Sequence, residues 1–176
     1  MENLRLRPGS VADRDHVLDL FDQNVEWLVA RGRAEQWGAT PWSRSPERRQ
    51  QVEDMLSAGS VLVAEDHDGR VGAVSVVADR PSSYVPTVDE PERFVRLLIV
   101  SPLWRGRNAG GLLLDRAKQQ AVADGVGLLR VDCWAGADGA LVAYYSGQGF
   151  TPDRLVTVRP GTAVQVLTWR PGDASA

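Results

Sequence analysis

The spacing of apolar and polar residues along the 176-residue chain predicts alternating strands and helices. Residues 4–7 alternate between leucine and arginine, which predicts a first strand that Pro8 and Gly9 interrupt. Ser10 follows as a typical helix N-cap, and apolar residues then recur at helical spacing over residues 17–29. A second helix is predicted from Pro46 to about residue 58, with Ser45 as its N-cap.

The middle of the chain has the pattern of a hairpin followed by a buried strand. Residues 61–65 and 71–77 are rich in valine and flank a turn that contains Gly69. Residues 79–92 hold three prolines and are predicted to form a loop. Residues 94–100 are almost continuously apolar, which is typical of a central strand covered on both faces.

The last third predicts a helix over residues 109–124, a strand over 128–133, a short helix over 138–148 and an antiparallel pair over 155–158 and 163–169. The element order β-α-α-β-β-β-α-β-α-β-β indicates an α/β (α+β) fold with a mixed central sheet of about seven strands flanked by about four helices. We expect one domain over residues 1–170 and a frayed tail over residues 171–176.

Composition excludes several classes of protein. Hydrophobic residues make up 43% and charged residues 24%, which suits a globular core. A net charge of -3 argues against a nucleic-acid binder. No apolar run approaches the roughly 20 residues of a membrane helix, and the N-terminus does not resemble a signal peptide. Cys133 is the only cysteine, so no internal disulfide can form and no metal site is predicted; a cytoplasmic location is expected.

The turn between residues 102 and 111 carries the strongest chemical indication in the chain. It follows the buried strand, opens a helix, and contains Gly106, Gly110 and Gly111 together with Arg105 and Arg107. Backbone N–H groups at such a turn converge on one point, and the helix dipole adds partial positive charge there. The segment therefore has the chemistry of a pyrophosphate-binding site, although an ordinary strand-to-helix turn with solvated arginines would have the same pattern.

Two other nucleotide-binding motifs do not fit this turn. A Rossmann turn requires G-x-G-x-x-G at the first strand of a βαβ repeat, and here the turn lies beyond residue 100 with no such repeat. A P-loop requires a terminal G-K-[ST], which is absent.

Residues 105–110, Arg-Gly-Arg-Asn-Ala-Gly, resemble the acyl-CoA pyrophosphate motif [QR]-x-x-G-x-[GA] of the GNAT superfamily of N-acetyltransferases. Leu98, Val100 and Pro102 match the end of that family's fourth strand. Asn108 stands where the first motif glycine is usual, but asparagine tolerates left-handed backbone angles better than most residues.

A second segment is similar to the same family's C-terminal signature, a helix that carries tyrosine and ends in Gly-Phe. Tyr145 stands five residues before Phe150, and Gly149 precedes that phenylalanine. Asp138 stands where an asparagine is usual. The two motifs occur in the family's order, and the resemblance covers about residues 4–169.

The resemblance implies an acetyl-CoA-dependent N-acetyltransferase in which the amine of a small molecule or peptide attacks the thioester directly. Tyr145 would donate a proton to the departing thiolate, and Cys133 is not needed as a nucleophile. The backbone of Leu98 and Val100 would bind the pantetheine arm, with the Val100 N–H as oxyanion donor. The implied cofactor-binding residues are Leu98, Ile99, Val100, Arg105, Gly106, Arg107, Asn108, Ala109, Gly110 and Gly111.

The general base is less directly indicated. Many family members carry a glutamate on the fourth strand at the position that aligns with Phe94. Glu92 lies two residues earlier, on the same face by strand parity, and is the candidate base. A solvated carboxylate at the start of the strand is the structural alternative.

Four residues are candidates for binding the acceptor. Asp132 and Trp134 share a strand face with Arg130, so Asp132 either holds a cationic amine or forms an ion pair with Arg130. Trp37 and Trp42 lie in the loop after the first helix, which is the family's usual acceptor region, and packing within a lid is their alternative.

Two further functions remain open at this point. One is a catalytically inactive acyl-CoA-binding or sensor module on the same fold, and the other is a transferase that uses a longer acyl-CoA. Neither a nucleic-acid nor a membrane partner is expected, and association into a homodimer is left open.

Overall fold

The computed structural model describes residues 4–136 and 138–173. Within that part, the strands form one mixed sheet in the order β1-β2-β3-β4-β5-β7-β6, in which β4 and β5 are parallel and the other registered pairs are antiparallel. This confirms the predicted fold class. The elements are β1 (Arg5–Gly9), α1 (Arg14–Val29), α2 (Pro46–Ser57), β2 (Ser60–Glu65), β3 (Val71–Ala78), β4 (Arg93–Val100), α3 (Ala109–Ala123), β5 (Leu129–Trp134), α4 (Ala140–Gly147), β6 (Thr151–Arg159) and β7 (Thr162–Trp169).

The chain divides into two compact units. The first combines the chain up to Val77 with Leu97–Leu113, and the second combines Ala78–Arg96 with the chain from Leu114 onward. Strand β4 and helix α3 each contribute residues to both units. The expectation of a single domain over residues 1–170 stays a prediction, and residues 174–176 of the expected tail lie outside the described residues.

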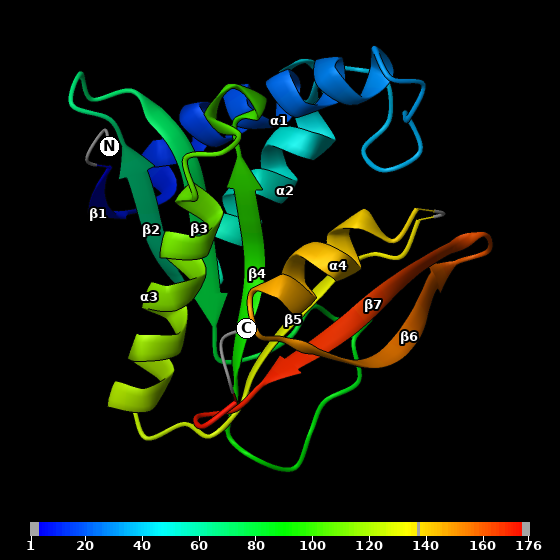
Figure 1. The fold of residues 1–176 in the computed structure, drawn as a ribbon. Coiled ribbons are helices and arrows are strands. Elements are labelled where there is room, and N and C mark those ends of the chain that lie inside the picture. Colours follow the sequence, from blue (N-terminus) through cyan, green and yellow to red (C-terminus); the bar gives the residue numbers. More distant parts are fainter. Residues whose placement is uncertain (1–3, 137, 174–176) are drawn as a thin grey trace. The chain divides into compact units, whose positions relative to one another are not determined.

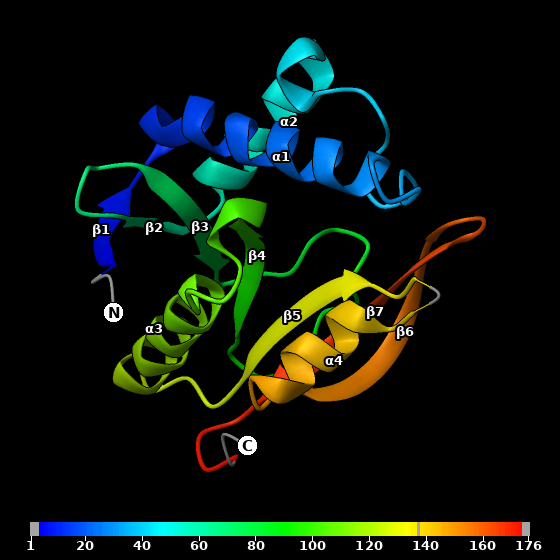
Figure 2. The same ribbon diagram turned by 45° about the horizontal axis from the view of Figure 1, so that its top comes forward.

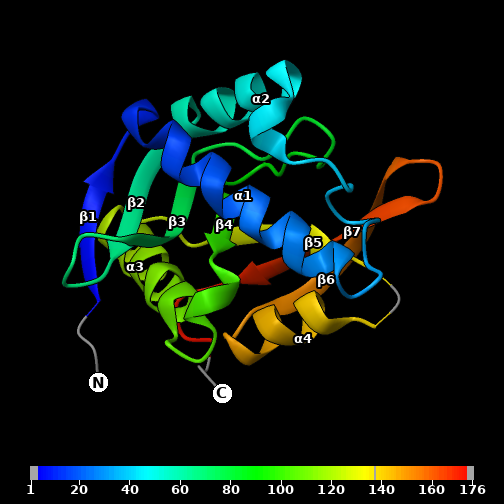
Figure 3. The same cartoon turned by 90° about the horizontal axis from the view of Figure 1, so that it is seen from above.

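In the first unit, α1 and α2 pack on one face of the strands and lie side by side (Figures 1 and 3). Ser45 caps α2 as predicted. The Ser10 side chain accepts a hydrogen bond from the N–H of Ala12, but it caps a short 3-10 turn, Val11–Asp13, and α1 itself begins only at Arg14. Burial of their apolar faces supplies the main stabilisation of this unit. The core includes Val17, Leu18, Phe21, Val25, Trp42, Val52, Leu56, Val63, Val74, Val76, Leu97 and Ile99.

The first strand is longer than predicted. Pro8 and Gly9 do not interrupt it, because β1 continues through both and pairs Pro8 with Leu62 and Gly9 with Val61 of β2. Strand β1 is the edge of the sheet, with β2 as its neighbour in the strand order. A proline lacks only the N–H, which an edge strand can lose on its open side without cost to the ladder.

In the second unit, α4 lies along β5, and β6 and β7 form a long antiparallel ribbon (Figure 2). Strand β6 begins at Thr151, earlier than the predicted residue 155. Its residues are almost all exposed, so the apolar alternation that marks a strand in the sequence is missing there. Residues 79–92 form a loop, as predicted, and Val85 from this loop packs with Phe94 and Val166.

None of the helices among the described residues has both the length and the apolar character that crossing a bilayer requires.

Candidate active site

The glycine-rich turn has the backbone conformation that a phosphate-binding turn requires. Gly106 has φ +81° and Asn108 has φ +56°, and among the described residues Asn108 alone takes positive φ without being glycine. The expectation that asparagine can occupy the left-handed region at this position is therefore confirmed. Helix α3 begins at the next residue, so its first N–H groups open onto this turn.

The side chain of Asn108 lies against the first turn of α3. A Cβ added to Gly111 would stand 2.2 Å from Asn108 Oδ1, which is closer than any real contact of this kind. The backbone carbonyl of Asn108 accepts the Leu112 N–H at 3.0 Å, as expected for the residue that precedes a helix. Only glycine fits at position 111 while Asn108 occupies this space.

A tryptophan and a glycine that the sequence reasoning did not single out hold the turn in place. Trp104 is buried, and a Cβ on Gly72 would lie 2.0 Å from its ring. The N–H of Ser101 donates to the carbonyl oxygen of Gly72 at 2.8 Å. The segment that leads into the turn thus packs against β3 at Gly72, where this strand has no side chain.

Both arginines of the turn stack on aromatic rings. The guanidinium of Arg105 lies 3.8 Å from the centroid of Trp27, whose ring also contacts Arg31 at 3.9 Å. Arg107 lies 5.1 Å from the ring of Trp104. Cation–π contacts of this kind orient the guanidinium groups. Trp27 therefore belongs to the site, although its place in an amphipathic helix pattern does not distinguish it from a packing residue.

The end of β4 is fixed by two polar side chains of α1. The Asn24 side chain donates to the carbonyl oxygen of Val100 at 3.0 Å, and the hydroxyl of Ser101 donates to Gln23 Oε1 at 2.6 Å. Ile99 is buried in the core beneath α1, whereas Leu98 and Val100 are half-buried near Trp104. These contacts hold the backbone that the resemblance assigns to the pantetheine arm.

The residues present in the first unit fit a CoA pyrophosphate. Gly106 and Asn108 both take left-handed angles, α3 begins directly after them, and Gly111 has no room for a Cβ. These features leave backbone rather than side chain at the turn. Exposed Arg105 and Arg107 add full positive charges. Such an arrangement binds a diphosphate through N–H groups and guanidinium groups together.

In the second unit, Tyr145 is buried and its ring meets the ring of Phe150 edge-on, with centroids 5.9 Å apart. Gly149 ends the helix with φ +86°, and the N–H of Phe150 donates to the Tyr145 carbonyl at 3.1 Å. The Tyr145 hydroxyl makes no hydrogen bond to any of the described residues. Burial raises the pKa of Tyr145 well above its usual value of 10, so its phenol stays protonated at neutral pH.

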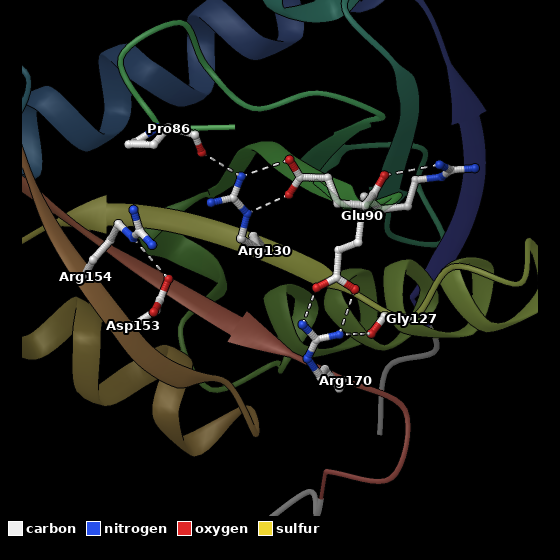
Figure 4. Close-up of polar contacts among 9 residues, drawn as sticks. Pro86, Glu90, Gly127, Arg130, Asp153, Arg154 and Arg170 are labelled. Atoms are coloured by element: carbon white, nitrogen blue, oxygen red, sulfur yellow. Dashed lines mark hydrogen bonds and ion pairs between the residues drawn. The ribbon is translucent and has the colours of Figure 1, made fainter. Parts of the chain in front are cut away.

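Glu92 is not solvated, and Arg130 does not pair with Asp132 as the sequence allowed. Arg130 Nε lies 2.6 Å from Glu92 Oε2 and Nη2 lies 2.9 Å from Oε1, and both side chains are almost fully buried. Nη2 also donates to the carbonyl of Pro86 (Figure 4). Buried charges need partners. Here β5 supplies the positive charge of Arg130 and the 79–92 loop supplies the negative charge of Glu92. With both oxygens engaged, the Glu92 carboxylate is poorly placed to take a proton from an amine.

Asp132 instead accepts a hydrogen bond from the hydroxyl of Tyr84, at 2.9 Å from Oδ2. Burial raises the pKa of Asp132 above its usual value, while the bond from Tyr84 and the charge of Arg96 oppose that rise. Burial of the hydroxyl end, and next the charge of Asp132, raise the pKa of Tyr84 to about 12. The ring of Tyr84 is partly exposed, so this hydrogen bond lies close to solvent.

Trp134 lines a cavity of about 380 Å³ with Thr157 and Thr162 of the β6–β7 ribbon. Its ring lies where a Cβ on Gly136 would stand, at 2.1 Å. The expectation that Trp134 borders a pocket thus has a structural counterpart in the second unit.

Trp37 and Trp42 pack into the core of the first unit. Trp42 stacks on Phe21 with centroids 3.8 Å apart, and Trp37 meets the same ring edge-on at 5.2 Å. The Trp42 indole N–H donates to the Trp37 carbonyl. A cavity of about 600 Å³ beside α1 is lined by other residues of this loop, including Pro41 and Arg44. The packing alternative therefore describes both tryptophans.

Potential metal ligands gather at one place in the described part of the chain, where Asp66, His67 and Asp68 have ligand atoms within 4.8 Å of one another. Asp66 Oδ1 accepts the N–H groups of Asp68 and Arg70. The hairpin turn explains this cluster without an ion.

The sheet order and the glycine-rich turn after β4 are those of the α/β fold that acyl-CoA-dependent transferases of the GNAT type share. The model of the family described as Acetyltransferase (GNAT) family matches residues 24–150. The chain belongs to this family of acetyltransferases, which use acetyl-CoA as co-substrate. No curated protein matches the sequence.

Solved structures share the fold at low sequence identity. A GNAT-family acetyltransferase of Listeria monocytogenes has a TM-score of 0.68 and 18% identity, with 96% of this chain and 95% of that chain covered. A Salmonella typhimurium protein, described as an acetyltransferase with its cofactor acetyl-CoA, has a TM-score of 0.63 and 18% identity, with 98% and 96% covered. The Escherichia coli ribosomal-protein-S18-alanine N-acetyltransferase has a TM-score of 0.65 and 14% identity, with 96% of this chain and 94% of that chain covered.

Proposed function

We propose that this protein transfers the acetyl group of acetyl-CoA directly to the amine of a small molecule or peptide. The observation that carries the proposal is the turn after β4, in which Gly106 and Asn108 both take left-handed angles directly before α3. This conformation turns backbone N–H groups outward and suits a diphosphate.

The donor is assigned to residues of the first unit. Backbone N–H groups of residues 105–111 and the guanidinium groups of Arg105 and Arg107 bind the diphosphate. The backbone of Leu98 and Val100 binds the pantetheine arm, and the Val100 N–H polarises the thioester carbonyl as it becomes tetrahedral. The hydrogen bond from the Asn24 side chain to the Val100 carbonyl supports this role, because it fixes the orientation of that backbone.

Tyr145 is assigned the proton that the departing thiolate requires. The amine nitrogen forms a bond to the carbonyl carbon, the carbon–sulfur bond breaks, and the Tyr145 hydroxyl protonates the sulfur. The proton that leaves the amine is taken by the base and afterwards restores the Tyr145 hydroxyl, so the enzyme returns to its starting state. A buried phenol whose pKa lies above 10 is fully protonated at neutral pH, and its hydroxyl makes no hydrogen bond to the described residues that would compete.

We assign the base to Asp132 rather than to Glu92. Both oxygens of Glu92 accept from Arg130, whereas Asp132 accepts one hydrogen bond from Tyr84 and has a pKa raised by burial. A carboxylate with a raised pKa both attracts an ammonium group and accepts its proton more readily than an ordinary aspartate. Trp134 borders the space for the rest of the acceptor.

An acyl-CoA-binding module without catalysis is the second candidate. The observation in its favour is Phe94, which is fully buried at the position where many family members carry a glutamate. Such a module would bind acetyl-CoA with the same turn but release no thiol when amines are added.

The decisive experiment is a thiol-release assay with acetyl-CoA and a panel of polyamines, amino acids, aminoglycosides and peptides, with an amine-free reaction as the hydrolysis control. Binding of CoA is followed in parallel by its effect on the melting temperature, since a ligand that binds the native state raises it. Amine-dependent release supports the transferase. CoA binding without release from any amine supports the binding module.

A further inference from the structure

Two arginines of the second unit differ in their pairing with carboxylates, although each has one buried nitrogen without an acceptor, Nη1 in Arg130 and Nε in Arg96. Arg130 has its Nε and Nη2 nitrogens filled by the two oxygens of Glu92. Arg96 has no carboxylate partner among the described residues: its Nη1 donates to the carbonyl of Pro81 at 3.5 Å, and its Nε is buried without an acceptor. A guanidinium presents a planar fork that matches a carboxylate, and in Arg96 this fork lacks its anion.

The position of Arg96 is set by the sheet. Strands β4 and β5 pair in parallel up to Val95 and Val131, and Arg96 and Asp132 are the residues that follow. The charge of Arg96 reaches Asp132, where it opposes the effect of burial on the carboxyl pKa. Arg96, which has no carboxylate at ion-pair distance among the described residues, and Asp132, whose carboxylate accepts a side-chain hydrogen bond from Tyr84, thus stand at the same level of the two strands.

A cation and an anion in this arrangement are complementary to a molecule that carries both charges. We propose that the acceptor is an amino acid, whose carboxylate binds Arg96 and whose amine binds Asp132. This proposal rests on the proposed acetyltransferase function and names the acceptor class of the same site. A plain amine would leave Arg96 without an anion, which a half-buried guanidinium tolerates poorly.

The amine end is formed by Asp132 and Tyr84. The Tyr84 hydroxyl donates to Oδ2 of Asp132, so the carboxylate is oriented and retains lone pairs for an ammonium group. Tyr84 belongs to the loop that Arg130 ties down through Pro86 and Glu92. The buried Arg130–Glu92 pair therefore positions Tyr84. Through Tyr84 it also positions the Asp132 carboxylate that binds the amine of the acceptor.

The acceptor side chain is assigned to the cavity bordered by Trp134. Trp134 lies two residues after Asp132 and so on the same face of β5. The cavity of about 380 Å³ is lined by the indole of Trp134, by Thr157 and Thr162, and by small residues, with no charged side chain among the described residues of the lining. An apolar side chain of moderate size, rather than a charged one, matches this lining.

A purely structural role for Arg96 does not account for the contacts. Its one hydrogen bond, to Pro81, is at the long end of the range, whereas Arg130 makes three shorter ones in the same unit. Anchoring of the 79–92 loop is already achieved by Arg130 and by Arg170, which binds Glu90 (Figure 4). The guanidinium of Arg96 is thus not required to anchor the 79–92 loop.

The test compares matched acceptors that differ only in the carboxylate: L-methionine, L-methioninamide and 3-(methylthio)propylamine, with the corresponding phenylalanine series. The amide has the less basic amine, so more of it is unprotonated at neutral pH and intrinsic reactivity favours the amide. We expect the acid to have kcat/KM about 10- to 100-fold above the amide, as charge-assisted hydrogen bonds of about 1.5–3 kcal/mol predict.

Arg96→Gln provides the second arm, with Arg93→Gln as control. Arg93 lies on the same strand, pairs with Asp124 and donates to the backbone carbonyl of Glu92, so its loss removes one positive charge but leaves the side chains of Arg96, Asp132 and Tyr84 in place. We expect Arg96→Gln to bring acid and amide within about threefold by raising the KM of the acid, with CoA binding unchanged, while Arg93→Gln keeps the preference. Calorimetry on the CoA-loaded protein measures amino-acid binding independently of turnover.

The outcomes separate the two proposals. Amine-dependent thiol release in which the acid is no better than the amide overturns the amino-acid assignment and leaves the transferase intact. Loss of CoA binding or of thermal stability in Arg96→Gln, with an unchanged preference, shows a structural role and also overturns it. Amino-acid binding that requires Arg96, without thiol release from any amine, supports the assignment and overturns the transferase.

Discussion

The ring of Trp104 occupies the space in which a side chain at Gly72 would stand, since a Cβ there would lie 2.0 Å from the indole. Trp104 belongs to the segment that leads from β4 into the glycine-rich turn proposed to bind the diphosphate, and Gly72 belongs to β3. Close packing of a ring on a bare backbone leaves no space for adjustment.

Gly72→Ala is therefore expected to displace Trp104 and, with it, the donor turn. Overpacking of this kind costs about 1–3 kcal/mol in the free energy of unfolding. The Kd for CoA should rise at least tenfold, measured by calorimetry. Gly127→Ala is the matched control, because a Cβ there meets nothing within 4 Å and its φ is not positive. Equal CoA binding by Gly72→Ala and wild type would show that Trp104 does not hold the turn.

The turn itself can be tested at two positions. Gly110→Glu places bulk and negative charge at the start of α3, where an anion should bind, so the rise in melting temperature with CoA should disappear. Asn108→Gly keeps the left-handed angle and removes the side chain that lies against Gly111, so CoA affinity should stay equal or increase. CoA binding by Gly110→Glu that matches wild type would contradict the assignment of the diphosphate to this turn.

Glu92→Gln should destabilise the protein rather than abolish proton abstraction selectively. The change leaves the Arg130 charge buried without its partner, which costs about 3 kcal/mol or more in the free energy of unfolding. Glu90→Gln is the control, because Glu90 binds Arg170 in a pair whose two side chains are both exposed. The loss in the free energy of unfolding should be much smaller in this variant. Denaturant titration of both variants measures the difference. A stable Glu92→Gln variant whose kcat has lost its pH dependence would restore Glu92 as the base.

Comparison of sequence and structure shows which information was local. The N-cap at Ser45, the left-handed angle of Asn108 and the end of α4 at Gly149 all depend on residues within a few positions, and the sequence predicts them correctly. The partners of charged groups depend on long-range pairing. Glu92 and Arg130 are 38 residues apart.

Long-range contacts also define the site residues that the sequence did not reveal. Trp27, Asn24 and Gly72 each contact residues near position 100 from distant parts of the chain. Nothing in their local pattern differs from that of ordinary packing or surface residues. The exposed strand β6 was predicted too short because strand prediction relies on burial of alternate residues, which this strand lacks.

Asp132→Asn separates binding from stability. We expect kcat to fall at least tenfold because the proposed base is lost. The KM for the acceptor should rise by the equivalent of about 2–3 kcal/mol at most, and the binding of CoA should stay unchanged. A carboxyl whose pKa is raised in the folded state contributes stability that is complete below its unfolded pKa and is lost as pH rises through its folded pKa. Wild type should therefore lose stability relative to Asp132→Asn as pH rises from about 4 toward 7. A variant that melts below wild type at neutral pH would indicate a structural role instead.

Tyr145→Phe is the sharpest test of the catalytic proposal. The change removes the hydroxyl and keeps the ring, so the edge-on contact with Phe150 should survive. The hydroxyl makes no hydrogen bond to the described residues, so its removal should not lower the melting temperature.

We expect kcat of Tyr145→Phe to fall at least tenfold, with the Kd for CoA little changed, because general-acid catalysis contributes about 10² to 10⁴ in rate. Tyr144→Phe is the internal control: it is the next residue on α4, is partly exposed, and points about 100° away around the helix. Since burial raises the pKa of Tyr145 above 10, wild-type activity should show no loss from its ionisation between pH 7 and about 9. Full kcat in Tyr145→Phe with a loss in Tyr144→Phe would move the acid to the neighbouring residue. Full activity in both would mean that the thiolate leaves unaided, and that the enzyme acts by positioning its two substrates.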